Sequence, residues 1–148
     1  MIDKNVGDLI TVSRHDLEEL IRQRVAEAIR QPTGFTANTL FTGIAVDTND
    51  IATINKRHGM PKDRFGVPGS VYSRHQYDDG NIIRNDGFSA KELHDKLRFL
   101  ALAVVGETKN GLVTRADIAT VREAYSKFRD EFLALYDDRA AKLAQEWK

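Results

Sequence analysis

The chain has 148 residues, of which 41% are hydrophobic and 30% are charged, and it contains no cysteine. This profile is typical of one soluble domain, and the lack of cysteine excludes disulfides, thiolate zinc sites, iron–sulfur clusters and cysteine nucleophiles. Lys plus Arg and Asp plus Glu are both 22, so the formal net charge is zero, which disfavours a protein held on DNA mainly by phosphate contacts. No apolar run approaches the roughly 20 residues that span a bilayer, and the start resembles no secretion signal. We therefore expect a cytoplasmic protein without membrane contact.

Four segments share one pattern: an apolar residue, then Ser, Thr or Asp, two further residues, an acid and a second apolar residue. At a helix start, the Ser, Thr or Asp caps a backbone N–H of the first turn, and the acid reaches back to the cap. The two apolar residues then pack together across the cap. Helical spacing follows each segment, so we predict four helix starts. The segments are V-S-R-H-D-L at 12–17, V-D-T-N-D-I at 46–51, F-S-A-K-E-L at 88–93 and V-T-R-A-D-I at 113–118.

The first helix is predicted over 14–30, because its apolar residues form one stripe and Pro32 follows its end. A short second helix is predicted over 48–57, and Gly59 stops it. The stripe of the first helix consists of Leu17, Leu20, Ile21, Val25, Ala28 and Ile29. The pattern does not decide whether this stripe packs within the chain or on another subunit.

The central residues between these helices and the C-terminal part lack helical spacing and are rich in Gly, Asn, Asp and Thr. The run L-F-T-G-I-A-V at 40–46 predicts a strand, and residues 58–70 predict an extended loop or arm. Residues 71–84 predict a small β-hairpin that turns at Asp79-Gly80. Long loops without regular structure are usually functional or disordered, so we expect an arm that docks on a neighbour.

Positive charge gathers in this central segment, interleaved with Phe65, Tyr72 and Tyr77. A basic loop with aromatic residues can follow a nucleic-acid backbone and stack bases. The alternative, which we favour, is an arm whose arginines pair with acids on a neighbouring subunit. Six Lys or Arg against four Asp over 51–88 leave a net charge of only +2. The candidate contact residues are Lys56, Arg57, Lys62, Arg64, Arg74 and Arg84.

The third helix is predicted over 90–105 and the fourth over 115–146. The short connection between them predicts an antiparallel hairpin. The third helix ends in F-L-A-L-A-V-V, which is apolar on every side and therefore predicts burial by neighbours on more than one side. The fourth helix carries apolar residues spaced alternately by three and four, which is also the pattern of a coiled coil.

The fourth helix is about twice as long as the third, so the hairpin can cover only its first half. Its second half still presents apolar side chains, and a contiguous exposed apolar patch usually marks an interface. We expect the helix at 14–30 or another subunit to cover it. The predicted interface residues are Leu133, Tyr136, Leu143 and Trp147.

One arrangement of histidines and aspartates provides the basis for an enzymatic alternative. The order of His75, His94-Asp95 and Asp117 or Asp130 resembles the H…HD…D order of helical metal-dependent phosphohydrolases, which implies a metal-dependent hydrolase. The sequence departs from that family's pattern around the HD pair, where charged residues replace the usual apolar ones. A solvated or interfacial His94 is therefore the interpretation we prefer, with no cofactor and no catalytic residue.

Together, these patterns predict a mainly α protein in three parts. They are an N-terminal segment (1–31) with an amphipathic helix, an irregular central arm (32–88) with one short helix and a small β-hairpin, and a C-terminal helical hairpin (89–148). The function expected is non-enzymatic. Such a chain would self-associate as a homo-oligomer or dock into a larger assembly of the virion, connector or scaffold type. Nucleic-acid binding through 56–84 is the first alternative, and the hydrolase around His94-Asp95 is the second.

Overall fold

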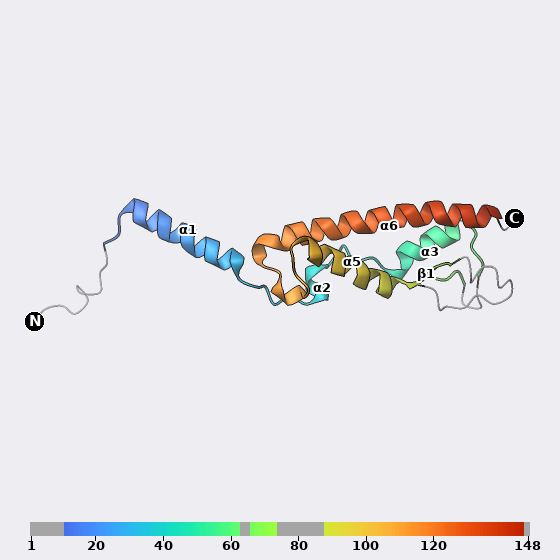
Figure 1. The fold of residues 1–148 in the computed structure, drawn as a ribbon, viewed down its shortest axis with the longest axis horizontal. Helices are drawn as coiled ribbons and strands as arrows, with labels where there is room; N and C mark the ends of the chain where they lie inside the picture. Colours follow the sequence, from blue (N-terminus) through green and yellow to red (C-terminus); the bar gives the residue numbers. More distant parts are fainter. Residues whose placement is uncertain (1–10, 63–65, 74–87, 147–148) are drawn as a thin grey trace, which may run out of the picture.

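The computed structural model describes residues 11–62, 66–73 and 88–146. Within these residues the chain forms five α-helices, two short strands and two 3₁₀ turns, so it is mainly helical, as predicted. The longest helix runs the length of the body, and a second helix lies antiparallel to it (Figure 1). The elements are α1 Arg14–Arg30, α2 Ala37–Leu40, α3 Thr48–Arg57, β1 Ser70–Val71, β2 Phe88–Ser89, α5 Ala90–Val104, η2 Asn110–Leu112, η3 Arg115–Asp117 and α6 Ile118–Glu146.

Three of the four predicted helix starts have the expected cap. The side chains of Ser13, Asp47 and Ser89 each accept a hydrogen bond from the backbone N–H three residues later. At α3 the acid also reaches back to the cap, which completes a capping box. The fourth start differs, because Thr114 begins the 3₁₀ turn η3 and its hydroxyl lies 3.3 Å from the Asp117 carboxylate. As a result α6 begins at Ile118, three residues later than predicted.

The predicted strand at 40–46 is wrong. Thr36 caps the short helix α2, and the following residues form a turn with helix-like hydrogen bonds. Two arginines of α6 hold this turn in place: Arg122 donates to the carbonyls of Leu40 and Thr42, and Arg129 donates to the carbonyl of Ile44. Because these carbonyls are already hydrogen-bonded, the turn packs on α6 without a partner strand.

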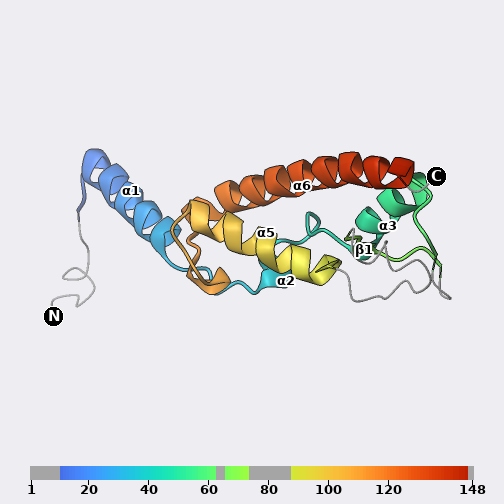
Figure 2. The ribbon, with the colours of Figure 1, turned by 45° about the vertical axis from the view of Figure 1, so that its right-hand side comes forward.

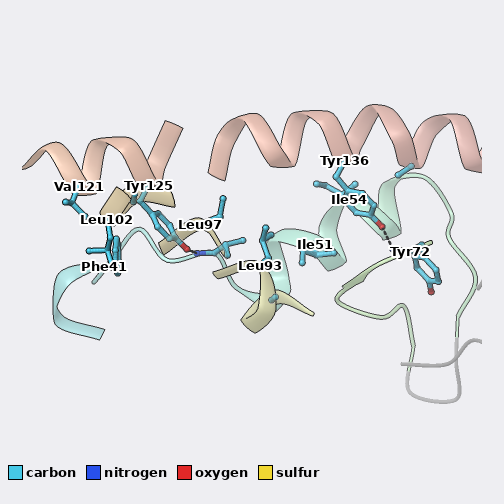
Figure 3. Close-up of a cluster of buried hydrophobic side chains, with 14 of the residues drawn as sticks. Phe41, Ile51, Ile54, Tyr72, Leu93, Leu97, Leu102, Val121, Tyr125 and Tyr136 are labelled. Atoms are coloured by element: carbon cyan, nitrogen blue, oxygen red, sulfur yellow. Dashed lines mark hydrogen bonds between the residues drawn. The ribbon is translucent and has the colours of Figure 1, made fainter. Parts of the chain in front are cut away.

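The core lies between α6 and the elements packed along it. Figure 3 shows Phe41, Leu102, Val121 and Tyr125 gathered at one end of this core, and Ile51, Ile54, Tyr72 and Tyr136 at the other. Helix α5 covers the first half of α6, as the hairpin prediction requires, and α3 contacts it further along. Close packing of these large side chains provides most of the favourable free energy of folding.

The second half of α6 is covered from within the chain. Figures 1 and 2 show α3 beside that half, and the segment around Tyr72 closes against it. Helix α1 does not provide this cover, so that part of our expectation is wrong. Contact of a second subunit with this half of α6, where Leu135 is exposed, stays a prediction. The close approach of the Gly69 backbone to α3 depends on glycine, since a Cβ there would overlap Cγ2 of Thr48.

The two strands pair antiparallel, with Ser70 opposite Ser89 and Val71 opposite Phe88. This small sheet joins the central segment to the start of α5. The predicted turn of the hairpin at Asp79-Gly80 lies outside the described residues.

Helix α1 projects away from this body (Figures 1 and 2). None of its residues is buried. It is attached at its C-terminal end, where Pro32 forms a β-bridge with Thr114. Beside the bridge, the N–H of Thr33 donates to the Val113 carbonyl at 2.9 Å, and the N–H of Gly34 donates to the Gly111 carbonyl at 3.0 Å.

Candidate interaction surface

The apolar stripe of α1 is exposed along its whole length. Its five large side chains, Leu17, Leu20, Ile21, Val25 and Ile29, are each between 41% and 55% exposed. Single exposed apolar residues are ordinary on protein surfaces, whereas contiguous exposed apolar patches are typical of interaction surfaces. We call these five residues the α1 stripe.

Local interactions alone give α1 little stability. Ser13 caps it, and three ion pairs lie on its surface, between Arg14 and Glu18, Arg22 and Glu19, and Arg24 and Glu27. Each such pair contributes about 0.2–0.5 kcal/mol to a helix. Most helices in proteins are stabilised by packing one apolar face against other elements rather than by local propensity alone. The α1 stripe therefore lacks the packing that a helix of this kind normally has.

A second, smaller exposed apolar patch lies at the C-terminal end of α5. Phe99, Leu100 and Val104 are 58%, 49% and 53% exposed, and Leu112 in η2 is also exposed. The prediction that this end of the helix is buried on more than one side is therefore wrong. The apolar run is continuous in sequence, but of its residues only Ala101 and Leu102 are buried in the core.

The residues predicted as an interface on the fourth helix lie mostly inside the chain. Tyr136 and Leu143 are buried and Leu133 is half-buried, while Trp147 lies outside the described residues. Tyr136 is the centre of a buried polar network. Its hydroxyl accepts from the Tyr72 N–H at 3.0 Å and donates to Oδ1 of Asn55 at 2.5 Å.

Asn55 extends this network. It is completely buried, and its Nδ2 donates to the carbonyls of Pro68 and Ser70 at 2.7 and 2.8 Å. The amide therefore connects α3 to the segment that closes over α6. Among the described residues, every buried side-chain nitrogen and oxygen has a hydrogen-bond partner. The sequence signal for this network was weak, because an asparagine within a short helix carries no sign of such distant partners.

A similar arrangement surrounds Tyr125, which precedes Tyr136 on α6. Its hydroxyl accepts from the Val46 N–H at 2.9 Å and lies 2.7 Å from Nδ1 of His94. Burial lowers the pKa of His94 below its ordinary value of 6.5, with Asp95 opposing and Arg98 adding to that effect. A neutral His94 can accept a hydrogen bond from the Tyr125 hydroxyl through Nδ1, so this histidine has a structural role in the core.

The residues that resemble a phosphohydrolase site do not form a metal site in the part of the chain described. His75 lies outside it, and Nδ1 of His94 faces the Tyr125 hydroxyl. Within residues 11–62, 66–73 and 88–146, no three histidine or acidic side chains are grouped to hold a metal ion. No helix in these ranges is both long and apolar enough to cross a bilayer.

The predicted basic cluster is only partly described. Arg64, Arg74 and Arg84 lie outside the described residues, and Lys56 is exposed while Lys62 belongs to the loop after α3. Arg57 instead pairs with Asp137 of α6 at 3.0 Å, and Nε2 of His58 lies 2.6 Å from the same carboxylate. The hydrogen bond from His58 and then the charge of Arg57 hold the pKa of Asp137 below its ordinary value, against an opposing effect of burial. Arg57, one of the predicted cluster residues, therefore forms an ion pair that links α3 to α6.

The chain matched no protein-family model, no curated protein and no solved structure.

Proposed function

We propose that this chain is a non-enzymatic subunit that self-associates through α1. The observation that carries the proposal is the α1 stripe, an apolar face on a helix with no buried residue. Burial of apolar surface is the main favourable term in association. Helix α1 buries none of its residues within its own chain, so a partner that covers the stripe would supply the packing that it lacks.

The body of the molecule supports this division of roles. Its core is complete without α1, and its buried polar groups are satisfied within the described residues. A preformed body with one uncovered helix suits a subunit that attaches to others while keeping its own fold. By analogy of architecture, the larger object would be a particle of the virion, connector or scaffold type.

The experiment is to measure the absolute mass of the chain by light scattering after size exclusion, over a wide range of concentrations. We expect a multiple of the 16.7 kDa chain mass that falls towards the mass of one chain on dilution. The test variant carries Ile21→Ser and Val25→Ser, which replace two central side chains of the stripe. We expect it to remain at the monomer mass under conditions where the wild type associates.

The matched control carries His15→Ser and Gln23→Ser, two exposed changes on the other face of α1. It should associate as the wild type does. A wild type that stays monomeric at every concentration would contradict the proposal. So would association that survives in the Ile21→Ser, Val25→Ser variant, because the interface would then lie elsewhere.

A further inference from the structure

We infer that the partner of α1 is α1 of a second copy, lying antiparallel to it. This inference rests on the proposed function and specifies the partner and its direction. Three features of the helix support it: the length of the exposed stripe, the positions of its apolar residues and the distribution of its charges.

The length of the stripe restricts what can cover it. Exposure is similar from Leu17 to Ile29, so the occupant must present apolar residues over this span, about 18 Å at a rise of 1.5 Å per residue. The patch at the end of α5 spans only 99–104 in its helix and is too short. Among the described residues, α1 itself is the exposed apolar helix face of matching length.

The apolar positions suit a two-fold antiparallel pair. Leu17 and Ile29 are equally far from Gln23 along the chain, and so are Ile21 and Val25. When two such helices are antiparallel and centred on Gln23, Leu17 of one copy faces Ile29 of the other, and Ile21 faces Val25. A closed two-fold contact of this kind uses the same surface on both subunits and forms a dimer without further growth.

The charges of α1 differ between its two halves. Residues 14–21 contain one Arg and three acids, a formal charge of −2, whereas 22–30 contain three Arg and one acid, a formal charge of +2. An antiparallel pair places the acidic half of each copy beside the basic half of the other, while a parallel pair places like halves together. The same distribution also suits the dipole of a single helix, so the experiment must measure direction.

Direction can be measured with spin labels, because the chain has no cysteine and each introduced one is unique. The variants His15→Cys and Gln31→Cys place a label at an exposed position near either end of α1. In an antiparallel dimer, each variant alone gives a label separation of about 24 Å or more, from the 1.5 Å rise per residue. A mixture of the two variants adds a short separation, within about 15 Å, since paired helices lie about 10 Å apart.

Each outcome has a separate meaning. Long separations in both single variants and a short one in the mixture would support the inference. Short separations in both single variants would show a parallel pair, which overturns the inference and leaves the proposed function intact. A sample without coupling between labels and with the monomer mass would overturn both.

A charge reversal tests the direction without labels. In the antiparallel pair, Glu18→Lys with Glu19→Lys makes both halves of α1 positive, so we expect the dissociation constant to rise roughly tenfold at low salt. Adding Arg22→Glu and Arg24→Glu makes the halves opposite again and should restore most of the affinity. Circular dichroism controls for a loss of helix. An unchanged dissociation constant in the double variant would overturn the inference, because parallel pairing exchanges one like-charged contact for another.

Discussion

Helices α1 and α6 follow related sequence patterns, but they lie in different surroundings in the folded chain. Both carry apolar residues at helical spacing after a Ser or Thr and an acid. Helix α6 buries Val121, Tyr125, Tyr136, Ala140 and Leu143, whereas α1 buries nothing. The comparison shows that capping and periodicity specify a helix but not the element that covers its apolar face.

Helix α6 differs from α1 because its side chains form hydrogen bonds with segments that are distant in sequence. Tyr125 and Tyr136 each accept a hydrogen bond from a backbone N–H of a distant segment, and Arg122 and Arg129 hold the turn after α2. These bonds determine which segments lie on the helix and in what register. The ion pairs of α1 all lie within the helix itself. We therefore expect substitutions in α6 to lower the folding stability more than those in α1, and the stability of the body to depend on pH through His94.

The largest expected effect is on the packing of the two helices. Leu143→Ala removes a completely buried side chain of α6 and should lower the free energy of unfolding by about 2–5 kcal/mol. The matched change Leu17→Ala in α1 should change it by about 0.5 kcal/mol or less. Urea denaturation of dilute protein, followed by circular dichroism, measures both. Equal losses would show that α1 belongs to the same cooperative core as α6.

A smaller effect is expected from the tyrosine hydroxyls of α6. Tyr136→Phe leaves the Tyr72 N–H and the Asn55 amide oxygen without their partner, which should cost about 1–3 kcal/mol of unfolding free energy. Tyr125→Phe likewise leaves the Val46 N–H without its acceptor and should lower the unfolding free energy by a similar amount. The same denaturation assay applies. A neutral Tyr136→Phe variant would mean that the hydroxyl does not fasten the central segment.

The smallest expected effect is a pH dependence through His94. Because burial lowers its pKa in the folded state, the unfolded chain binds a proton at higher pH than the folded chain does. Stability should therefore be complete above about pH 6.5, the ordinary value for histidine, and fall as the pH decreases towards the lowered pKa of the folded state. Unfolding measured in steps from about pH 8 to about pH 5 tests this. His94→Gln should show a shallower slope over that range, and an identical slope would assign the dependence to other groups.

The sequence predicted the local structure better than the packing. Ser13, Asp47 and Ser89 are caps because each acts within its own first turn, which spacing alone reveals. The apolar run at 40–46 suggested a strand, and only the distant Arg122 and Arg129 explain why it forms a helix and turn. The cover over the second half of α6 depends on Asn55 and Tyr72, which lie far from that helix in sequence.

The candidate surface was predictable only in part. The stripe of α1 can be read from its spacing, and its charges can be counted. Its exposure could not be predicted, because the same pattern is found in helices that fold back onto their own chain. For the apolar end of α5 the sequence predicted burial, but the structure shows exposure. Phe99, Leu100 and Val104 belong to a continuous apolar run, yet they lie on the outer face of the helix.

Helix α1 is joined to the body near its C-terminal end, at Pro32, so a change of angle there displaces the whole helix. Hydrogen bonds to the α5–α6 connection hold the residues that follow the helix, so the free end moves further than the held end for any given rotation. A rotation of about 10° at the junction displaces the far end of a helix about 25 Å long by roughly 4 Å, from the rise per residue. In a dimer paired through α1, the angle at this junction would set the orientation of the two bodies relative to each other. The geometry of the assembly would then be controlled by Pro32, Thr33 and Gly34, which lie outside the interface itself.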